Sequence, residues 1–190
     1  MRIAVIGTGK IGGSLGAQWR AAGHDVFFGG RTASGDGPGG APVVPIADAL
    51  IDADVVLLAV PGKVAADVVS ANSDALDGKI IIDATNNIGA PEVNCRAAVT
   101  ANVPNAHYAR AFNSLGYENF VSPPAGACLF FAADPDARTA VEELITVTGL
   151  EPAFVGDGSA ASIVDGVAAL WFALVRQSGG NRKLAFRVVR

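Results

Sequence analysis

Three glycines near the amino terminus have the spacing of a phosphate-binding turn. Gly7, Gly9 and Gly12 form G-x-G-x-x-G between the apolar residues 3–6 and a helical pattern over residues 11–22. In such a unit the first glycine allows a tight turn and the second lets the backbone approach a pyrophosphate. The third lets the helix pack on the strand, and the amino end of that helix faces the phosphates. The predicted dinucleotide cradle consists of Gly7, Thr8, Gly9, Lys10, Ile11 and Gly12.

The end of the second apolar run, residues 25–28, indicates which dinucleotide is bound. Gly29 and Gly30 follow it, and then Arg31 and Thr32, where an NAD-binding chain usually has Asp or Glu for the ribose 2′-hydroxyl. Arg31 instead offers a permanently charged, planar fork that suits a 2′-phosphate, with Thr32 as a hydroxyl donor. We therefore predict NADP rather than NAD. The alternative is that Arg31 is only a solvated loop arginine.

The residues that follow the other apolar runs are the next candidates, because ligands lie at the carboxyl ends of the strands in a parallel sheet. An apolar, stiff segment at residues 59–61 suits packing against a ribose and the adjacent ring. Short polar side chains at Thr85, Asn86, Asn113 and Ser114 can hold a carboxamide or a planar ring, or can simply be turn residues. The predicted cofactor contacts at these strand ends are Ala59, Val60, Pro61, Ala84, Thr85 and Asn113.

The same strand ends offer no His, Lys, Tyr or Cys as acid, base or nucleophile. Asp83 is more typical of a turn cap than of a base, and His24 and His107 have ordinary positions near turns. A dehydrogenase that acts on an alcohol or a carbonyl normally needs a side chain for the proton, whereas hydride transfer between two planar heterocycles needs mainly positioning. The residues favour an NADP-dependent oxidoreductase without a catalytic acid or base. A module that binds NADP without turnover also fits this absence.

The elements that must position these residues alternate between strand and helix. Strands are expected at residues 3–6, 25–28, 55–60, 79–83, 109–112, 128–132 and 152–155, and helices at 11–22, 46–51, 64–76, 94–101, 135–148 and 160–176. This alternation predicts an α/β fold, a Rossmann-type doubly wound, mostly parallel sheet. We expect an NADP-binding domain over residues 1–158 and a short helical extension over 159–190, without an independent substrate domain. Residues 32–45, rich in glycine and proline, predict a loop.

Composition and charge restrict the partners. The 190 residues carry a net charge of −4, which argues against nucleic acid. The apolar stretches are broken by glycine, proline or charge, so we expect none to span a membrane, and the start of the chain predicts a cytoplasmic protein. Cys95 and Cys128 are interpreted as packing residues, with neither a disulfide nor a metal site. The end of the chain is basic and contains Arg176, Arg182, Lys183, Arg187 and Arg190. This basic tail is either a solvated helix end or a site that binds an anion.

Several segments together resemble NADPH-dependent reductases of the deazaflavin coenzyme F420 over nearly the whole chain. They are I-A-V-I-G-T-G-K-I-G-G, G-H-D-V-F-F-G-G-R, V-V-L-L-A-V-P, I-I-I-D-A-T-N, A-F-N-S-L-G, and the ending A-A-L-W-F-A-L-V through L-A-F-R-V-V-R. The resemblance implies a small Rossmann domain that forms a homodimer and passes hydride between NADP and coenzyme F420. It also implies cofactor contacts at residues 8–12, at Arg31 and at the A-V-P segment. A-F-N-S and the last apolar helix would border the second ring.

The chain departs from this family pattern at three places, which leaves the acceptor open. Lys10 stands where Asn is common, Asn87 stands where the family has proline, and Ala33 and Ser34 follow the arginine where another basic residue is frequent. The alternatives are an NADP-dependent flavin or ferric reductase that uses the same face, and the non-catalytic module. Imine and pyrroline reductases add a helical domain for which this chain leaves no room.

Overall fold

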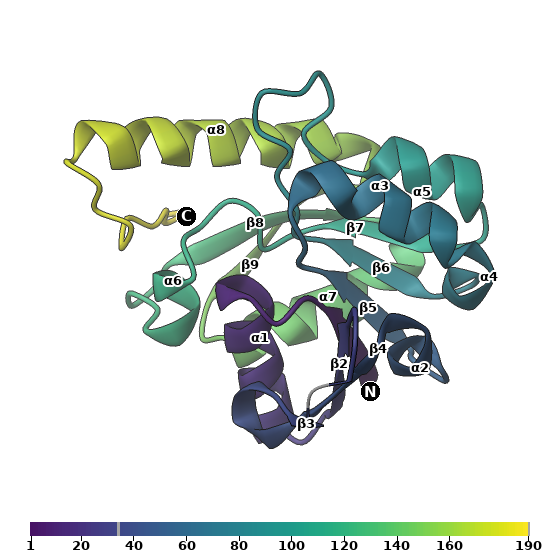
Figure 1. Ribbon diagram of the computed structural model, residues 1–190. Helices are drawn as coiled ribbons and strands as arrows, with labels where there is room; N and C mark the ends of the chain where they lie inside the picture. Colours follow the sequence, from purple (N-terminus) through teal and green to yellow (C-terminus); the bar gives the residue numbers. More distant parts are fainter. Residues whose placement is uncertain (34, 190) are drawn as a thin grey trace.

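The computed structural model describes residues 1–33 and 35–189 (Figure 1). Its strands are β1 (Arg2–Ile6), β2 (Asp25–Gly30), β3 (Gly35–Asp36), β4 (Pro42–Pro45), β5 (Val55–Leu58), β6 (Ile80–Asp83), β7 (His107–Arg110), β8 (Cys128–Ala133) and β9 (Glu151–Gly156). Its α-helices are α1 (Lys10–Ala21), α2 (Ile46–Leu50), α3 (Gly62–Ala71), α4 (Ser73–Leu76), α5 (Arg96–Asn102), α6 (Glu118–Val121), α7 (Pro135–Val147) and α8 (Ala161–Gln177). Two short 3₁₀ helices, η1 (Pro38–Gly40) and η2 (Gly158–Ala160), complete the described elements.

Within these residues nine strands form one sheet in the order β3-β4-β2-β1-β5-β6-β7-β8-β9. The pairs from β4 through β7 are parallel, as is β8 with β9, whereas β7 with β8 and β3 with β4 are antiparallel. The predicted doubly wound, mostly parallel Rossmann-type fold is confirmed. Because β1 lies between β2 and β5, the chain order reverses at β1, and the crevice at the carboxyl ends of these three strands is where such sheets bind ligands.

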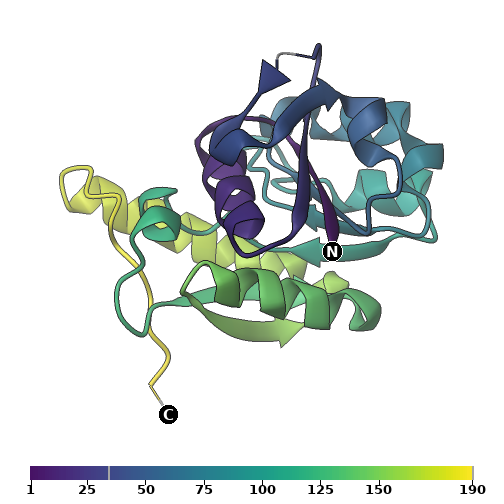
Figure 2. The same cartoon turned by 90° about the horizontal axis from the view of Figure 1, so that it is seen from below.

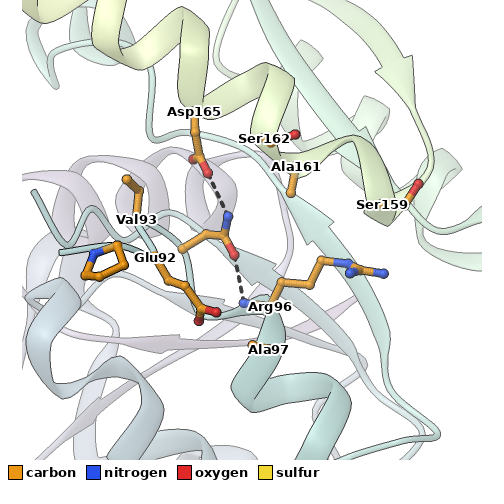
Figure 3. A pocket seen from close by; sticks show the side chains of 10 residues that line it. Glu92, Val93, Arg96, Ala97, Ser159, Ala161, Ser162 and Asp165 are labelled. Carbon is orange, nitrogen blue, oxygen red and sulfur yellow. Dashed lines mark hydrogen bonds between the residues drawn. The ribbon is translucent and has the colours of Figure 1, made fainter.

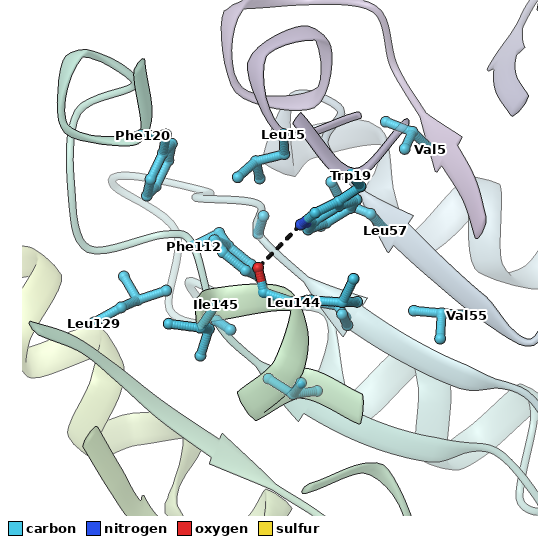
Figure 4. Close-up of a cluster of buried hydrophobic side chains, with 14 of the residues drawn as sticks. Val5, Leu15, Trp19, Val55, Leu57, Phe112, Phe120, Leu129, Leu144 and Ile145 are labelled. Carbon is cyan, nitrogen blue, oxygen red and sulfur yellow. Dashed lines mark hydrogen bonds between the residues drawn. The ribbon is translucent and has the colours of Figure 1, made fainter. Parts of the chain in front are cut away.

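Helices cover both faces of the sheet, and a separate cluster of buried apolar side chains lies between the sheet and the helices on each face. The first cluster joins β1 and β5 to α1 and α7, and the second joins the other face of the same strands to α2, α3 and α5. In the first, the Trp19 indole donates a hydrogen bond to the Leu144 carbonyl at 3.0 Å, and its ring meets Phe112 edge-on (Figure 4). Since β5 is buried on both faces, its run of apolar residues follows from its place at the centre of the sheet.

The predicted loop over residues 32–45 is wrong in part. Residues 42–45 form β4, which pairs in parallel with β2 and extends the sheet, and residues 35–36 form the short β3 at its edge. Prolines at both ends of β4 hid this strand in the sequence, yet proline is tolerated where a strand lies near the sheet edge. Ser34 lies outside the described residues.

Two further differences concern short elements. The predicted helix over residues 64–76 is two helices, α3 and α4, because the backbone at Asn72 leaves helical geometry with φ −128° and ψ 24°. Helix α6 was not expected, since four residues give too little periodicity to recognise. Neither difference moves the strand ends that carry the candidate site.

The last helix, α8, has the length and apolar character that were predicted for residues 160–176 and is shifted by one residue. Among the described residues, Gly158–Gln177 is long and apolar enough by length and composition to cross a membrane, so the expectation that no stretch has this length is wrong. Asp165 and Gly166 interrupt the apolar run in the sequence but lie inside one continuous helix. Here α8 packs on β7 and β8 through one face, whose residues Ala161, Val164, Ala168 and Trp171 are buried.

The chain beyond α8 turns back and is fixed to the sheet, as Figure 2 shows. The Cys128 N–H donates to the Phe186 carbonyl at 2.8 Å, and the Trp171 indole donates to the Leu184 carbonyl at 2.8 Å. Both cysteines are buried, which confirms their interpretation as packing residues. The predicted boundary between residues 158 and 159 stays a prediction.

Candidate functional site

The glycine turn after β1 has the geometry that its spacing predicts. Gly7 has φ +116°, a conformation that side chains disfavour, and a Cβ on it would lie 2.6 Å from the Ala59 carbonyl oxygen. A Cβ on Gly12 would overlap the carbonyl oxygen of Gly7 and press on the Val5 side chain at 3.0 Å. These two glycines therefore let the turn, α1 and the β5 end pack closely together.

The amino end of α1 is open to an anion. Gly9 is the N-cap, no side chain caps the helix, and its first turn carries no acid. The first N–H groups of a helix have no partner within the helix, and the helix dipole adds partial positive charge there. A Cβ on Gly9 would meet nothing within 4 Å, so the backbone faces free space. The Lys10 ammonium lies 4.9 Å from the centre of the Tyr117 ring, which adds a cation beside this helix end.

Replacing Gly9 with alanine tests this cradle without disturbing the fold. The added methyl has room in the free protein, but it would occupy the space that a pyrophosphate needs, so we expect NADPH affinity to fall about tenfold or more. Calorimetric titration measures this loss. The control is Gly166→Ala in the exposed part of α8, where a Cβ also meets nothing within 4 Å. Equal NADPH affinity in both variants would contradict the role of Gly9.

A cavity of about 520 Å³ joins the turn to the ends of β2 and β5. Five predicted residues line it, namely Gly7, Thr8, Arg31, Val60 and Pro61. Thr32 is exposed and is not among the lining residues. The apolar wall of the cavity includes three residues that were not predicted, Ile46, Val64 and Val68. The spacing of Val64 and Val68, four residues apart on α3, was the available signal, because it places both on one helix face.

The end of β6 is a buried polar network rather than an open binding surface. Ala84 and Thr85 are buried, and the Thr85 hydroxyl donates to Asp83 Oδ1 at 2.7 Å. Asp83 also accepts the N–H groups of Thr85 and Cys95 and the Tyr108 hydroxyl, at 2.7 to 3.0 Å. The interpretation of Asp83 as a turn cap is confirmed. The Thr85 side chain is engaged within the protein, although it was predicted to contact the cofactor.

Arg110, which was not among the predicted residues, lies at the centre of this network. It is fully buried at the end of β7, directly opposite Asp83 in the sheet register. Its Nη1 donates to the Asp83 and Thr85 carbonyls and lies 3.1 Å from Asp83 Oδ1, while Nη2 donates to Asn86 Oδ1. Its Nε and Nη2 also contact Asp165 Oδ1 at 2.8 and 2.6 Å. The available signal was an arginine between the apolar residues Ala109 and Ala111, because a buried charge requires partners.

The ionisable groups of the network have pKa values shifted away from neutrality. Burial raises the pKa of the Cys95 thiol, and neighbouring Asp83 raises it further. Burial and the same carboxylate raise the pKa of Tyr108 well above its ordinary value. Burial is the largest single influence on Arg110 and would lower its pKa, but Asp83, Tyr108 and Asp165 together outweigh it, and the net shift is upward. At neutral pH the Cys95 thiol, the Tyr108 phenol and the Arg110 guanidinium are therefore all protonated. Their role in the network is structural.

Asn113 follows β7 at the same edge. Phe112 before it has φ +63°, an uncommon conformation for a bulky residue that recurs at functional sites. Asn113 is 3% exposed, and its Oδ1 is buried without a hydrogen-bond partner. Its carbonyl oxygen accepts from Asn86 Nδ2 at 2.9 Å. The predicted residue is thus present at the strand end with an acceptor still free.

A second cavity, of about 460 Å³, lies between the segment after β6 and helix α8. Residues 165, 168, 169, 172, 175 and 176 of α8 line it, a spacing that marks one face of a helix. Asn86, Ile88 and Val93 line it from the segment after β6. The lining is mostly apolar, with Asp165 at one end of the helical stripe and Arg176 at the other. The apolar last helix therefore borders a cavity through one face while Trp171 packs in the core.

A third, more polar cavity of about 430 Å³ shares Val93 and Asp165 with the second. Figure 3 shows Asp165 of α8 facing the segment before α5. Asn94 Nδ2 donates to Asp165 Oδ2 at 2.6 Å, and Asn94 Oδ1 accepts the Arg96 N–H at 3.0 Å. Asp165 therefore joins α8 to the segment between β6 and α5.

The basic tail does not act as one group. Arg176 borders the second cavity, whereas Arg182 pairs with Glu118 at 3.1 Å and lies over the Trp171 ring. The Arg187 guanidinium lies near Gly126, where a Cβ would meet its Nε at 3.1 Å. Arg190 lies outside the described residues. Among the described cations of the tail, Arg176 is the one that lines a cavity.

The glycine turn, Arg31 and the other residues that line the first cavity all lie within one segment of the chain, residues 2–87. Residues 2–87 match the family described as NADP oxidoreductase coenzyme F420-dependent. This match to the F420-dependent NADP oxidoreductases confirms the resemblance stated above and supports an NAD(P)-dependent oxidoreductase. The matched residues include the whole glycine turn, Arg31 and the ends of β5 and β6, so they carry the first cavity.

Solved structures extend the likeness in fold to the rest of the chain. A candidate F420-dependent NADP reductase from Arthrobacter sp. FB24 is similar with a TM-score of 0.85 and 22% identity, over 100% of both chains. A hypothetical protein from Sinorhizobium meliloti is 28% identical with a TM-score of 0.69, over 100% of this chain and 96% of that one. A reductive aminase from Aspergillus terreus, in complex with NADPH and ethyl levulinate, is 20% identical with a TM-score of 0.68. The match covers 93% of this chain and 62% of the aminase.

Proposed function

We propose that this protein transfers hydride between NADP(H) and a planar acceptor, and that the acceptor is coenzyme F420. The observation that carries the proposal is that two cavities lie at the carboxyl ends of the parallel strands. The first contains the glycine turn and Arg31, and the second is largely apolar and lies beside Asn86 and α8. NADPH in a complex with the structurally similar aminase and the family match support the cofactor.

The residues present fit the cofactor in three places. The open amino end of α1 would hold the pyrophosphate, and the exposed guanidinium of Arg31 would hold the 2′-phosphate. The free Oδ1 of Asn113 would accept from the carboxamide. When bound, NADPH supplies the hydride. The protein's part is to bind the two rings face to face and exclude water, and we assign no residue to proton transfer.

Mixing the protein with NADPH and coenzyme F420 tests this proposal through the loss of deazaflavin absorbance. We expect F420 reduction, with slower or no reduction of FMN, riboflavin and ferric acceptors. Faster reduction of a flavin or of ferric iron would overturn the choice of acceptor. NADPH binding without reduction of any acceptor would favour the non-catalytic module. The predicted homodimer and cytoplasmic location stay predictions.

Arg176 provides a further test, because it is the cation on the helical stripe beside the second cavity. We expect Arg176→Gln to raise the KM for an anionic acceptor such as F420 or FMN about twofold to fivefold. The KM for uncharged riboflavin should not change, since it carries no anionic group. Lys183→Gln, in the exposed tail, is the matched control. An equal change for FMN and riboflavin would show that Arg176 does not recognise charge.

A further inference from the structure

The side-chain amide of Asn113 has one polar atom with a hydrogen-bond partner and one without. Its Nδ2 lies 3.4 Å from Asp165 Oδ1, to which it donates, while its Oδ1 is buried and accepts no hydrogen bond. Two other buried side-chain atoms in the described part lack partners, Arg2 Nε and Asn119 Oδ1. Arg2 begins β1 and therefore lies at the amino ends of the parallel strands, away from the candidate site. The Asn119 side-chain amide binds the chain after α8 by donating to the Arg182 and Leu184 carbonyls. Asn113 is therefore the free acceptor at the carboxyl ends of the parallel strands.

Asp165 determines which end of the Asn113 amide is free. Rotating that amide by half a turn would bring its oxygen against the Asp165 carboxylate, and two acceptors repel each other. The carboxylate itself cannot turn away easily, because Oδ1 contacts Arg110 Nε and Nη2 at 2.8 and 2.6 Å and Oδ2 accepts from Asn94 at 2.6 Å. Phe112, with φ +63°, fixes the backbone immediately before the amide. Asn113 is thus oriented before any ligand binds.

We propose that Asp165 is a positioning residue that acts through Asn113, presenting its Oδ1 to the N–H of the nicotinamide carboxamide. The inference rests on the proposed function, since it requires NADP at this edge of the sheet. A carboxamide offers the donor that a buried amide oxygen lacks, and an unpaired buried acceptor is unfavourable. Holding the carboxamide fixes the rotation of the nicotinamide ring, and so selects the face that meets the second cavity. Helix α8, which borders that cavity, thereby contributes to cofactor geometry through Asp165.

The test compares NADPH with its 3-acetylpyridine analogue, in which a methyl group replaces the carboxamide NH₂ and no donor remains. We expect the wild type to bind NADPH about fivefold to tenfold more tightly than the analogue, the effect of one neutral hydrogen bond. In Asp165→Ala, which removes the acceptor for Asn113 Nδ2, and in Asn113→Leu, the ratio of the two affinities should fall to about one. Affinity for 2′,5′-ADP, which lacks the nicotinamide, should stay unchanged and would show that the cleft is intact.

A merely structural role for Asp165 would weaken NADPH and the analogue together and leave their ratio unchanged. Asp157→Ala, which removes an exposed acid in the turn before α8, is the matched control and should keep the wild-type ratio. Equal binding of NADPH and the analogue by the wild type overturns the inference, as does an unchanged ratio in Asp165→Ala. Failure of the wild type to bind NADPH or 2′,5′-ADP at all would instead refute the proposed function.

Discussion

Replacing Arg31 with serine is expected to lower the affinity for NADPH about tenfold to a hundredfold, with little change in the affinity for NADH. Arg31 lies at the end of β2 and lines the first cavity together with Gly7 and Thr8. Its planar guanidinium can make two charge-assisted hydrogen bonds to a 2′-phosphate, a group that NADH lacks. Gly29 and Gly30 before it line the same cavity. Titration of both cofactors by calorimetry gives the preference directly.

Two further variants separate shape from charge. Arg31→Lys keeps the charge but loses the fork, so its NADPH affinity should fall between those of the wild type and the serine variant. Arg20→Ser removes an exposed arginine in the last turn of α1, far along the helix from the glycine turn, and should leave both affinities unchanged. The role of Arg31 is falsified if the serine variant keeps the wild-type preference for NADPH.

Replacing Arg110 with methionine is expected to lower the free energy of unfolding by about 3–5 kcal/mol. Methionine fills similar space, but it leaves Asp83, which is fully buried, without its cation. It also removes the bonds that hold Asn86 and Asp165 to the strand ends. A buried charge that loses its partner keeps the full cost of leaving water. Urea denaturation followed by circular dichroism measures the change.

The matched control is Arg138→Met, which removes an exposed arginine paired with Glu142 four residues away on α7. Surface pairs of this kind contribute little because water and salt screen them, so we expect a loss of about 1 kcal/mol or less. If the two variants lost the same stability, Arg110 would not hold the network together. NADPH affinity measured on the folded Arg110→Met protein would then show how far the strand ends depend on it.

The sequence was most informative where local chemistry and periodicity fix the structure. The spacing of Gly7, Gly9 and Gly12 predicts the turn because only glycine accepts the left-handed backbone at Gly7 and the close approach at Gly12. The apolar runs predict the parallel strands, since strands buried on both faces need apolar residues throughout. Edge strand β4 was missed because its prolines favour a loop, and its pairing with β2 outweighs that local preference.

By itself, the sequence determined the Rossmann-type sheet, the phosphate-binding turn and the place of Arg31, because each depends on residues close together in the chain. Only the tertiary structure brought Asp83, Arg110 and Asp165 together, since they come from β6, β7 and α8 and their contact depends on which strands are neighbours. It also decided that Thr85 turns inward while Asn113 keeps a free acceptor. The physical reason is that a buried charge selects its partners by distance in space, which no sequence spacing encodes.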